Sequence, residues 1–236
     1  MDTSGQQRRN ASQPGAIIAF FDIDRTLFDG LTGIEALKHF YQTGTVGKTA
    51  VAWTVFYALR EKLNLMDPVA MVNRAVGFFA GWRREDLLAE TEKIVKNRVI
   101  PGLYPEGLAL LRHHRSQGHR PVLLTATSWD IAQPLAAFLE VDFIASQGEL
   151  RGEVYTDRAV MPVPYGQGKV TRAREYCAAA GARLEQAWFY TDSHSDIPLL
   201  ETVGHPVAVN PSRALNRHAA ARGWPVLRFP PVSRGT

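Results

Sequence analysis

The sequence predicts an α/β protein in which a parallel sheet is flanked by helices and an all-helical cap is inserted after the first strand. Two observations predict this fold class. Short apolar runs that end in polar residues alternate with helical runs through most of the 236 residues, and such alternation favours a parallel sheet covered on both faces. Between residues 30 and 100 the helical pattern continues alone, broken only by glycine and proline. That segment is expected to be the cap.

The expected elements follow one another along the chain. Strands are expected at residues 16–22, 121–125, 142–146, 186–191 and 206–209. Helices are expected at residues 105–117, 130–139, 169–180, 195–203 and 212–222. A small hairpin at 149–154 is expected on the edge of the sheet. These elements divide the chain into a disordered tail at 1–15, a core at 16–29 and 101–229, the cap at 30–100 and a short tail at 230–236.

Two carboxylates mark the end of the first expected strand. Asp22 and Asp24 follow an apolar run and are separated by one residue, so they repel each other unless a cation lies between them. Mg²⁺ prefers hard oxygen ligands of this kind and usually binds where a phosphate completes its shell. The pattern therefore indicates a phosphoryl-handling metal site. The alternative is an ordinary turn, because Asp and Thr side chains both bond to nearby backbone.

Three later segments favour the metal site over the turn. Thr125 ends an apolar strand, and its hydroxyl and the N–H groups after it can bind a phosphate oxygen. Lys169 begins a helical run, where its charge can neutralise a phosphate. After a third apolar strand, Asp192 can complete a metal site and Asp196 can hold Lys169 or a water beside the metal. All four segments are expected to meet, because open α/β sheets build ligand sites at the carboxyl ends of their strands.

In this order the four motifs resemble those of the haloacid dehalogenase superfamily of phosphohydrolases. The matching residues are Asp22-Ile23-Asp24-Arg25-Thr26, then Thr125, then Lys169, then Asp192 with Asp196. The resemblance spans residues 17–210, and the stretch 192–200 is similar to the branch that contains phosphoserine phosphatase. It implies a Rossmann-like core domain, and a cap inserted after the first motif fits that branch.

The resemblance implies a role for each motif residue. Asp22 would be the nucleophile that forms an aspartyl phosphate. Asp24 would protonate the leaving alcohol and then deprotonate the attacking water. Thr125 and Lys169 would bind the phosphoryl group of a small phosphomonoester. The Mg²⁺ ion would be held by Asp22, the backbone carbonyl of Asp24 and Asp192.

The chain departs from the phosphoserine phosphatases at positions that would contact the substrate. Their Glu that binds the substrate ammonium group has Leu31 as its counterpart here. Their cap Arg, which holds the substrate carboxylate, is matched by Arg74 or Ala75. Arg25 stands where small or neutral residues are commoner, so its side chain would either contact the substrate or point outward, and we favour the outward orientation. An amino-alcohol phosphate such as phosphoserine or histidinol phosphate is the first substrate to try, on resemblance alone.

Two other interpretations are compatible with the sequence. A phosphotransferase or phosphomutase would use the same Asp22 intermediate with an alcohol as acceptor. A non-catalytic interaction protein would keep the fold and use its cap as a contact face, because large apolar patches usually mark interactions. That face could serve a homodimer or a membrane surface. The large apolar side chains in question are Trp53, Phe56, Tyr57, Phe78, Phe79 and Trp82.

Composition limits the remaining function classes. The net charge of +4 and the pI near 9.3 come with scattered Arg residues and no nucleic-acid-binding motif, so an anionic small substrate explains them. The single cysteine, Cys177, excludes an intramolecular disulfide. Residues 1–15 lack the apolar stretch of a secretory signal, and the longest apolar run, 49–59, is far shorter than the ~20 residues that span a bilayer. A cytoplasmic location is the default expectation.

Overall fold

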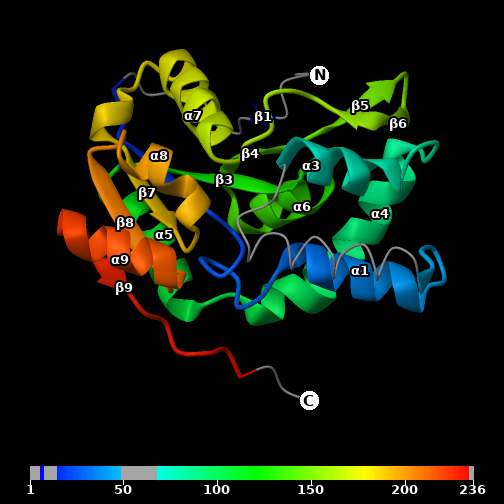
Figure 1. Ribbon diagram of the computed structural model, residues 1–236, viewed down its shortest axis with the longest axis horizontal. Coiled ribbons are helices and arrows are strands. Elements are labelled where there is room, and N and C mark those ends of the chain that lie inside the picture. Colours follow the sequence, from blue (N-terminus) through cyan, green and yellow to red (C-terminus); the bar gives the residue numbers. More distant parts are fainter. Residues whose placement is uncertain (1–5, 8–14, 49–67, 234–236) are drawn as a thin grey trace.

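The computed structural model describes residues 6–7, 15–48 and 68–233 and has the expected α/β architecture (Figure 1). Its main sheet contains β1 Gln6–Gln7, β2 Ile18–Phe21, β3 Arg120–Ser128, β4 Asp142–Ser146, β7 Trp188–Thr191, β8 His205–Val209 and β9 Val226–Leu227. The strand order is β1-β4-β3-β2-β7-β8-β9. Every neighbouring pair is parallel except β1 with β4. The predicted Rossmann-like parallel sheet is confirmed.

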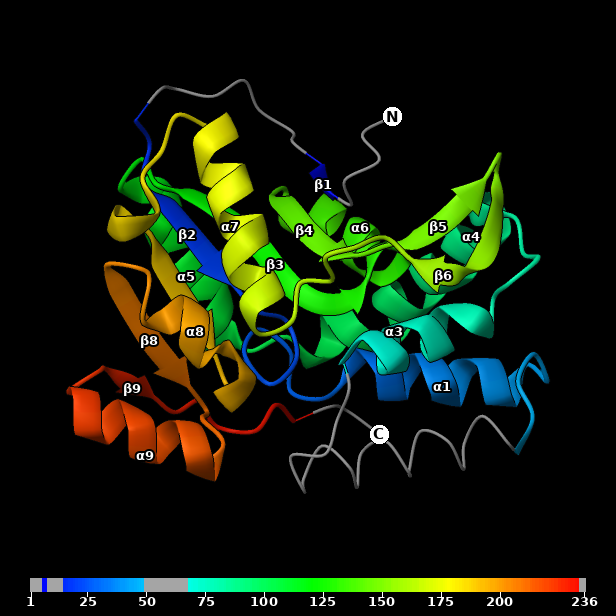
Figure 2. The same ribbon diagram turned by 45° about the horizontal axis from the view of Figure 1, so that its top comes forward.

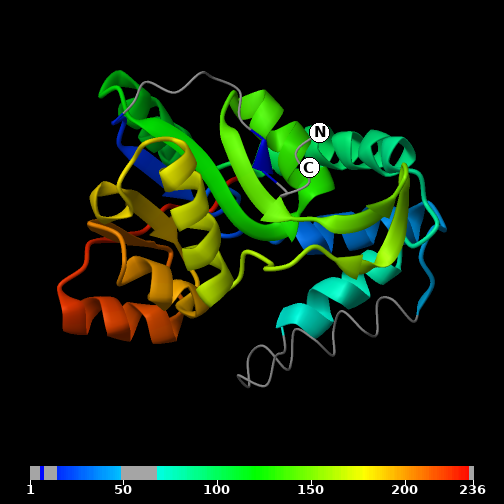
Figure 3. The same cartoon turned by 90° about the horizontal axis from the view of Figure 1, so that it is seen from above.

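Helices cover both faces of this sheet (Figure 3). One face carries α5 Pro105–Ser116 and α6 Trp129–Leu139, and the other carries α7 Gln167–Ala179, α8 Ile197–Leu200 and α9 Arg213–Arg222. Side chains of β2 alternate between the two apolar clusters, so that Phe21 packs on the α5 and α6 side and Phe20 on the other. Because both faces are buried, the strands are apolar throughout, which explains why their positions were predictable.

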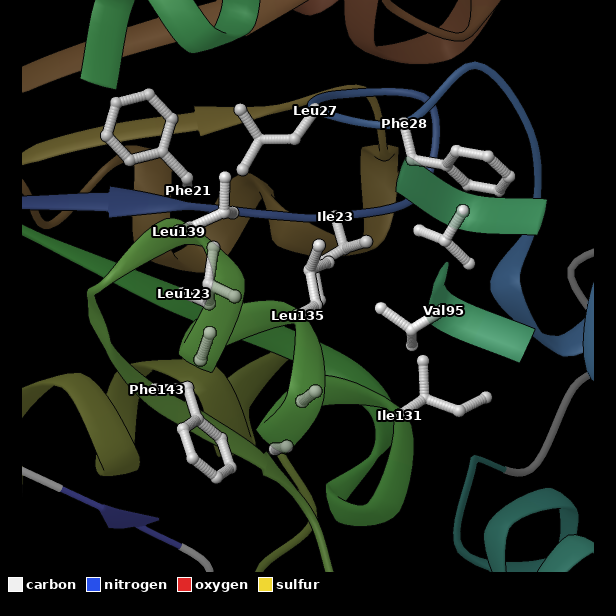
Figure 4. Packing of buried hydrophobic residues seen from close by; sticks show 14 of the residues in the cluster. Phe21, Ile23, Leu27, Phe28, Val95, Leu123, Ile131, Leu135, Leu139 and Phe143 are labelled. Atoms are coloured by element: carbon white, nitrogen blue, oxygen red, sulfur yellow. The ribbon is translucent and has the colours of Figure 1, made fainter. Parts of the chain in front are cut away.

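Figure 4 shows the first of these clusters, in which Phe21, Leu123 and Phe143 of the sheet meet Leu135 and Leu139 of α6. Each of these side chains is at most 7 % exposed. Burying a side chain of this size contributes about 1.5–3 kcal/mol. This cluster holds β2 rigidly, and β2 leads directly into the first carboxylate motif.

The cap, within the described residues, consists of α1 Thr32–Gln42, α3 Pro68–Gly77 and α4 Arg84–Ile94. A π-helical turn, Val95–Val99, and a 3₁₀ turn, Ile100–Gly102, return the chain to the core. Apolar side chains of α1 and α4 belong to the same buried cluster as α6. Cap and core therefore share one apolar interior.

Three aromatic side chains of the cap, Phe40, Phe79 and Trp82, pack together. The Phe40 ring lies 4.9 Å from that of Phe79 and 6.2 Å from that of Trp82, measured between centroids, and both partners pack against the shared interior. The predicted contact-face residues Trp53, Phe56 and Tyr57 lie outside the described residues. In the part of the chain that is described, no helix is both long and apolar enough to cross a membrane.

The expected hairpin exists, but its predicted place on the edge of the main sheet was wrong. Strands β5 Gly148–Arg151 and β6 Val154–Ala159 form a separate two-stranded sheet that reaches toward the cap (Figure 1). Its Tyr155 N–H donates to the Trp82 carbonyl and its Tyr155 carbonyl accepts from Gly81, both at 2.9 Å. The Tyr155 hydroxyl also donates to Asp130 at the start of α6. The hairpin thus joins cap to core.

Both expected tails contain ordered contacts. Gln6–Gln7, within the expected disordered tail 1–15, pairs with β4 as the edge strand β1. At the opposite edge, β9 was not predicted, because two residues are too short for a periodic pattern. Beyond it, the Val232 N–H donates to the Asp29 carboxylate at 2.7 Å, so residues of the expected tail 230–236 contact the core.

Candidate active site

The carboxyl ends of β2, β3 and β7 bring the predicted motif residues Asp22, Thr125 and Asp192 to the same edge of the sheet. Strand β2 lies between β3 and β7. The helix before β3, α5, packs on one face of the sheet and the helix before β7, α7, packs on the other, which makes the end of β2 a switch point where open α/β sheets bind ligands. Phe21 pairs with Leu123 on one side and with Tyr190 on the other. Asp22 follows Phe21 directly, while Thr125 and Asp192 each come two residues after those partners.

Lys169 is the centre of a buried charge cluster. Its ammonium nitrogen lies 2.7 Å from Asp196 Oδ2 and 3.3 Å from Asp22 Oδ1, and the residue is 2 % exposed. Burial by itself would lower the pKa of Lys169, but the charges of Asp196 and Asp22 outweigh burial and raise it. The amine therefore stays charged, although it is removed from water.

Asp196 contacts the Lys169 ammonium group and is itself fixed by a hydrogen bond from Thr191. Its Oδ2 accepts a hydrogen bond of 2.6 Å from the Thr191 hydroxyl as well as the bond from Lys169. Of the two roles weighed for Asp196, the structure shows the contact with Lys169. Because Thr191 is the last residue of β7, the position of Asp196 depends directly on the sheet.

Asp22 is a buried carboxylate aimed at Lys169. Its backbone N–H donates to the Tyr190 carbonyl at 2.9 Å, which ties the residue to β7. Burial raises the pKa of Asp22 above its ordinary value, while Lys169 opposes that shift. The oxygen that faces the ammonium group is suitably placed to act as a nucleophile beside a charge that would attract an anionic substrate.

Asp24 lies under the first helix of the cap. Its Oδ1 accepts a hydrogen bond of 2.8 Å from the backbone N–H of Thr32, the first residue of α1. Burial raises the pKa of Asp24 to about 7, in the range where a carboxyl group can both give and take a proton near neutral pH. The Thr32 hydroxyl bonds to the Thr127 hydroxyl at 2.8 Å, so the same cap residue also contacts β3.

Thr32 and Thr127 were not predicted from the sequence. Thr127 stands two residues after Thr125 on one strand, and its N–H donates to Thr125 Oγ1 at 3.1 Å. The only available signal was that spacing, since residues two apart lie on one face of a strand. Thr125 itself is 1 % exposed. Strand β3 continues past it to Ser128, with a shift of register against β4.

Asp192 and Arg25 form the outer side of the site. Burial and the nearby Asp22 charge raise the pKa of Asp192 to about 8. An Arg25 guanidinium nitrogen lies 3.9 Å from Asp192 Oδ2, and the Arg25 side chain is 56 % exposed. The outward orientation expected for Arg25 agrees with this exposure, although the guanidinium leans toward Asp192.

Asp22, Asp192 and the backbone carbonyl of Asp24 are oxygen ligands of the kind that suits a divalent cation. The charge of Asp22 raises the pKa of both Asp24 and Asp192, so these carboxylates repel one another and a cation shared among them would relieve that repulsion. Among the described residues, no group of three His, Cys, Asp or Glu side chains is arranged to hold a metal. Two carboxylates and a backbone carbonyl fit Mg²⁺ nevertheless, because this ion keeps several waters.

Residues 19–201 match the haloacid dehalogenase-like hydrolases. The chain belongs to this family. A phosphoserine phosphatase of Mycobacterium tuberculosis is 29 % identical over 89 % of this chain and 70 % of its own length. A histidinol-phosphatase of Neisseria meningitidis is 28 % identical over 90 % of this chain and 98 % of its own. Within the haloacid dehalogenase-like family, this chain is a hydrolase of phosphoric monoesters.

A solved structure extends the likeness to the whole fold. A protein of unknown function from Bordetella pertussis superimposes with a TM-score of 0.82 at 29 % identity, covering 90 % of this chain and 98 % of that one. The fold of this chain is therefore shared with that protein over nearly its full length.

Proposed function

We propose that this haloacid dehalogenase-like chain is a magnesium-dependent phosphatase that hydrolyses a small organic phosphomonoester through an aspartyl phosphate on Asp22. The observation that supports it most is the buried contact of 3.3 Å between Asp22 and Lys169. A carboxylate attacks a phosphate anion only where their mutual repulsion is cancelled. The fixed charge of Lys169 meets part of that requirement beside the attacking oxygen.

The first step transfers the phosphoryl group to the enzyme. An Asp22 carboxylate oxygen forms a bond to phosphorus as the bond from phosphorus to the ester oxygen breaks. The proton on Asp24 goes to that departing oxygen, and the free alcohol leaves. The raised pKa of Asp24, about 7, allows it to hold this proton near neutral pH.

The second step returns the enzyme to its starting state. A water oxygen bonds to phosphorus while the bond from phosphorus to Asp22 breaks, and Asp24 takes the proton that the water gives up. Inorganic phosphate leaves with Asp22 again ionised. Thr125 and Lys169 bind the phosphoryl oxygens in both steps, and Asp196 keeps Lys169 in place through their contact of 2.7 Å.

Mg²⁺ would be held by Asp22, the backbone carbonyl of Asp24 and Asp192, and it would neutralise charge on the phosphoryl oxygens. The side chains of Asp22 and Asp192 are 9 % and 10 % exposed. Their raised pKa values show that each is costly to ionise in isolation. Metal binding would therefore favour the ionised form that the nucleophile requires.

An amino-alcohol phosphate is the substrate class that we propose to test first. The names of the two curated relatives support it, one being a phosphoserine phosphatase and the other a histidinol-phosphatase. Leu31, which stands in place of an ammonium-binding Glu, is the residue that precedes α1. The nearby Glu35 is already paired with Lys38 at 2.9 Å and Arg98 at 3.5 Å. Any ammonium contact thus differs from that of the phosphoserine phosphatases.

Phosphate release from a panel of small phosphomonoesters, with Mg²⁺ or with a chelator, tests this proposal. The panel includes phosphoserine and histidinol phosphate, and Asp22→Asn is the control. We expect release that needs Mg²⁺ and disappears in the variant, because an amide cannot attack phosphorus. Release that persists in Asp22→Asn would contradict the mechanism. Added acceptor alcohols distinguish the alternatives, since a phosphotransferase would form new phosphate esters and a non-catalytic protein would form neither product.

The cytoplasmic location and a homodimer or membrane-surface contact of the cap stay predictions. Size-exclusion chromatography and sedimentation with liposomes test the latter two. The described aromatic residues Phe79 and Trp82 pack into the shared interior, so a contact face would involve other cap residues.

A further inference from the structure

The segment formed by residues 228–233 runs beside the loop 24–30, which begins with Asp24 of the first motif (Figure 2). The Val232 N–H donates to Asp29 Oδ2 at 2.7 Å, and the Tyr104 hydroxyl donates to Asp29 Oδ1 at 2.7 Å. Both oxygens of one carboxylate are therefore bonded, to two parts of the chain far apart in sequence. We call residues 228–233 the strap.

Asn210 makes a second connection between the strap and the same loop. Its side-chain carbonyl accepts from the Phe229 N–H at 2.8 Å, and its side-chain amide donates to the Arg25 carbonyl at 3.2 Å. Asn210 has a φ of 43°, a left-handed conformation that Asn tolerates better than most residues. One side chain thus joins the end of β8, the strap and the residue that follows Asp24.

The strap also lies over the two connections between core and cap. The outgoing and returning chains pair here, since the Asp29 N–H donates to Gly102 and the Tyr104 N–H donates to Leu27, both at 2.8 Å. The Phe229 ring packs against the Tyr104 ring with centroids 5.4 Å apart. The strap is therefore attached to both connections at once, by hydrogen bonds and by an apolar contact.

The backbone of this loop is strained at Arg25. Arg25 adopts a φ of 57°, and a left-handed conformation costs a residue with a side chain about 1 kcal/mol or more. Its guanidinium is mostly exposed and lies 3.9 Å from the Asp192 carboxylate, which is a weak contact. The bond from Asn210 to the Arg25 carbonyl acts directly on this strained residue.

We propose that the strap positions the loop that carries Asp24, with Asn210 and Asp29 as its two positioning residues. The inference rests on the proposed function, because it assigns the strap an effect on the proton transfer by Asp24. A displaced Asp24 transfers its proton less effectively, whereas binding of the phosphoryl group by Lys169 is unaffected. Loosening the strap therefore lowers kcat and leaves KM nearly unchanged.

Asn210→Asp is the first test. It keeps the oxygen that accepts from Phe229 and tolerates the same φ, but it removes the donor to Arg25. We expect kcat to fall about tenfold for the best alkyl phosphomonoester of the panel and about twofold for 4-nitrophenyl phosphate, whose leaving group hardly needs a proton. Arg228→Ala is the matched control, because the Arg228 guanidinium donates to the Asn216 side chain of α9 at 2.7 Å, and this variant should keep full activity.

Val232→Pro tests the other attachment, because proline lacks the N–H that Asp29 accepts. Val232→Ala keeps that N–H and is its control. Hydrogen exchange at the amides of Arg25, Asp29 and Gly30 gives a readout independent of turnover. We expect exchange about tenfold faster in Val232→Pro and in Asn210→Asp than in the wild type and the two controls.

The results distinguish a failure of the strap inference from a failure of the proposed phosphatase. Unchanged exchange in both strap variants would overturn it, and so would an equal loss of kcat on the alkyl and aryl substrates or the same loss in Arg228→Ala. An inactive wild type would overturn the proposed phosphatase instead, and the exchange data would then decide about the strap alone. Faster exchange together with a selective loss on the alkyl substrate would support both.

Discussion

Both ends of the parallel sheet bury carboxylates, but at the carboxyl end the carboxylates outnumber the cations beside them. At the amino end, the Arg120 guanidinium pairs with Asp142, and the Tyr176 hydroxyl donates to the same carboxylate. At the carboxyl end, Asp22 and Asp196 contact the ammonium group of Lys169. The Asp22 charge also acts on Asp24 and Asp192, and Arg25 lies outside, 3.9 Å from Asp192. Burial raises the pKa of Asp22, Asp24 and Asp192.

This difference distinguishes buried charges that stabilise the fold from buried charges that bind a ligand. A buried ion pair whose members are fully bonded holds its surroundings together, and removing one partner strands the other. An excess of buried carboxylates destabilises the folded state unless a cation binds, so such a cluster is explained by function. The same sheet thus has a structural end and a reactive end, and five experiments test this distinction.

Lys169→Met should give the largest effect. It removes the charge beside Asp22 and keeps a side chain of similar length, so the turnover of folded protein should fall about 10³-fold, as expected when a fixed charge at the reacting group is lost. Phosphate release, normalised to the folded fraction by circular dichroism, measures it. Turnover within tenfold of the wild type would show that the reactive end does not depend on this charge.

Arg120→Met removes a buried cation from the amino end. It strands the Asp142 carboxylate, which is 4 % exposed, so the free energy of unfolding should fall by about 3 kcal/mol. We expect kcat of the folded fraction to stay within about twofold. Urea denaturation measures the first quantity, and Arg183→Met, whose exposed partner Glu185 lies 3.8 Å away, is the near-neutral control. A large loss of kcat would break the comparison.

Asp24→Asn should slow alkyl phosphomonoesters about 10²-fold and aryl esters much less, because only the alkyl leaving group needs a proton from the enzyme. The ratio of kcat values on the two ester types measures it. Equal slowing of both types would count against the acid role. The fold should be retained, since the amide oxygen can still accept the bond from Thr32, at 2.8 Å in the wild type.

The amino end should respond to pH through stability alone. Burial, followed by the charges of His119, His113 and His205, lowers the pKa of His114 to about 4, against an ordinary value of 6.5. The unfolded chain therefore binds the proton first as pH falls, so the stabilisation is complete above pH 6.5 and is lost toward pH 4, by roughly 2 kcal/mol. Urea denaturation across this range, compared with His114→Phe, measures it. An identical pH dependence in the variant would refute the assignment.

Thr127→Val should give the smallest effect. It deletes the hydroxyl that bonds to Thr32 at 2.8 Å and leaves the backbone bond to Thr125 intact. The loss of one such bond contributes about 1 kcal/mol, so kcat should fall about fivefold. Thr127→Ser keeps the hydroxyl and is the control. If both variants lose the same activity, the methyl group and not the hydrogen bond is responsible.

That Asp22, Thr125 and Asp192 meet was predictable because each follows an apolar run at the carboxyl end of a parallel strand. Asp22, Thr125 and Asp192 follow short apolar runs, and parallel pairing alone brings such positions to one edge. Their residue types then narrow the chemistry to metal and phosphoryl binding. Thr32 was missed because a backbone N–H carries no signal of residue type, and Asn210 because its partners lie 19 and 185 residues away.

The sequence by itself determined the order of strands and helices, the insertion of the cap and the set of carboxylates with one lysine, because these depend on local periodicity and on residue chemistry. Only the tertiary structure decided what each element contacts. The hairpin pattern at 149–154 was recognisable, yet its strands pair with the cap main chain at Gly81 and Trp82. Residues 230–233 of the strap belong to the expected tail, yet the Val232 N–H donates to Asp29 in the core. Backbone hydrogen bonds and charge contacts between distant segments have no sequence period, so the folded chain alone reveals them.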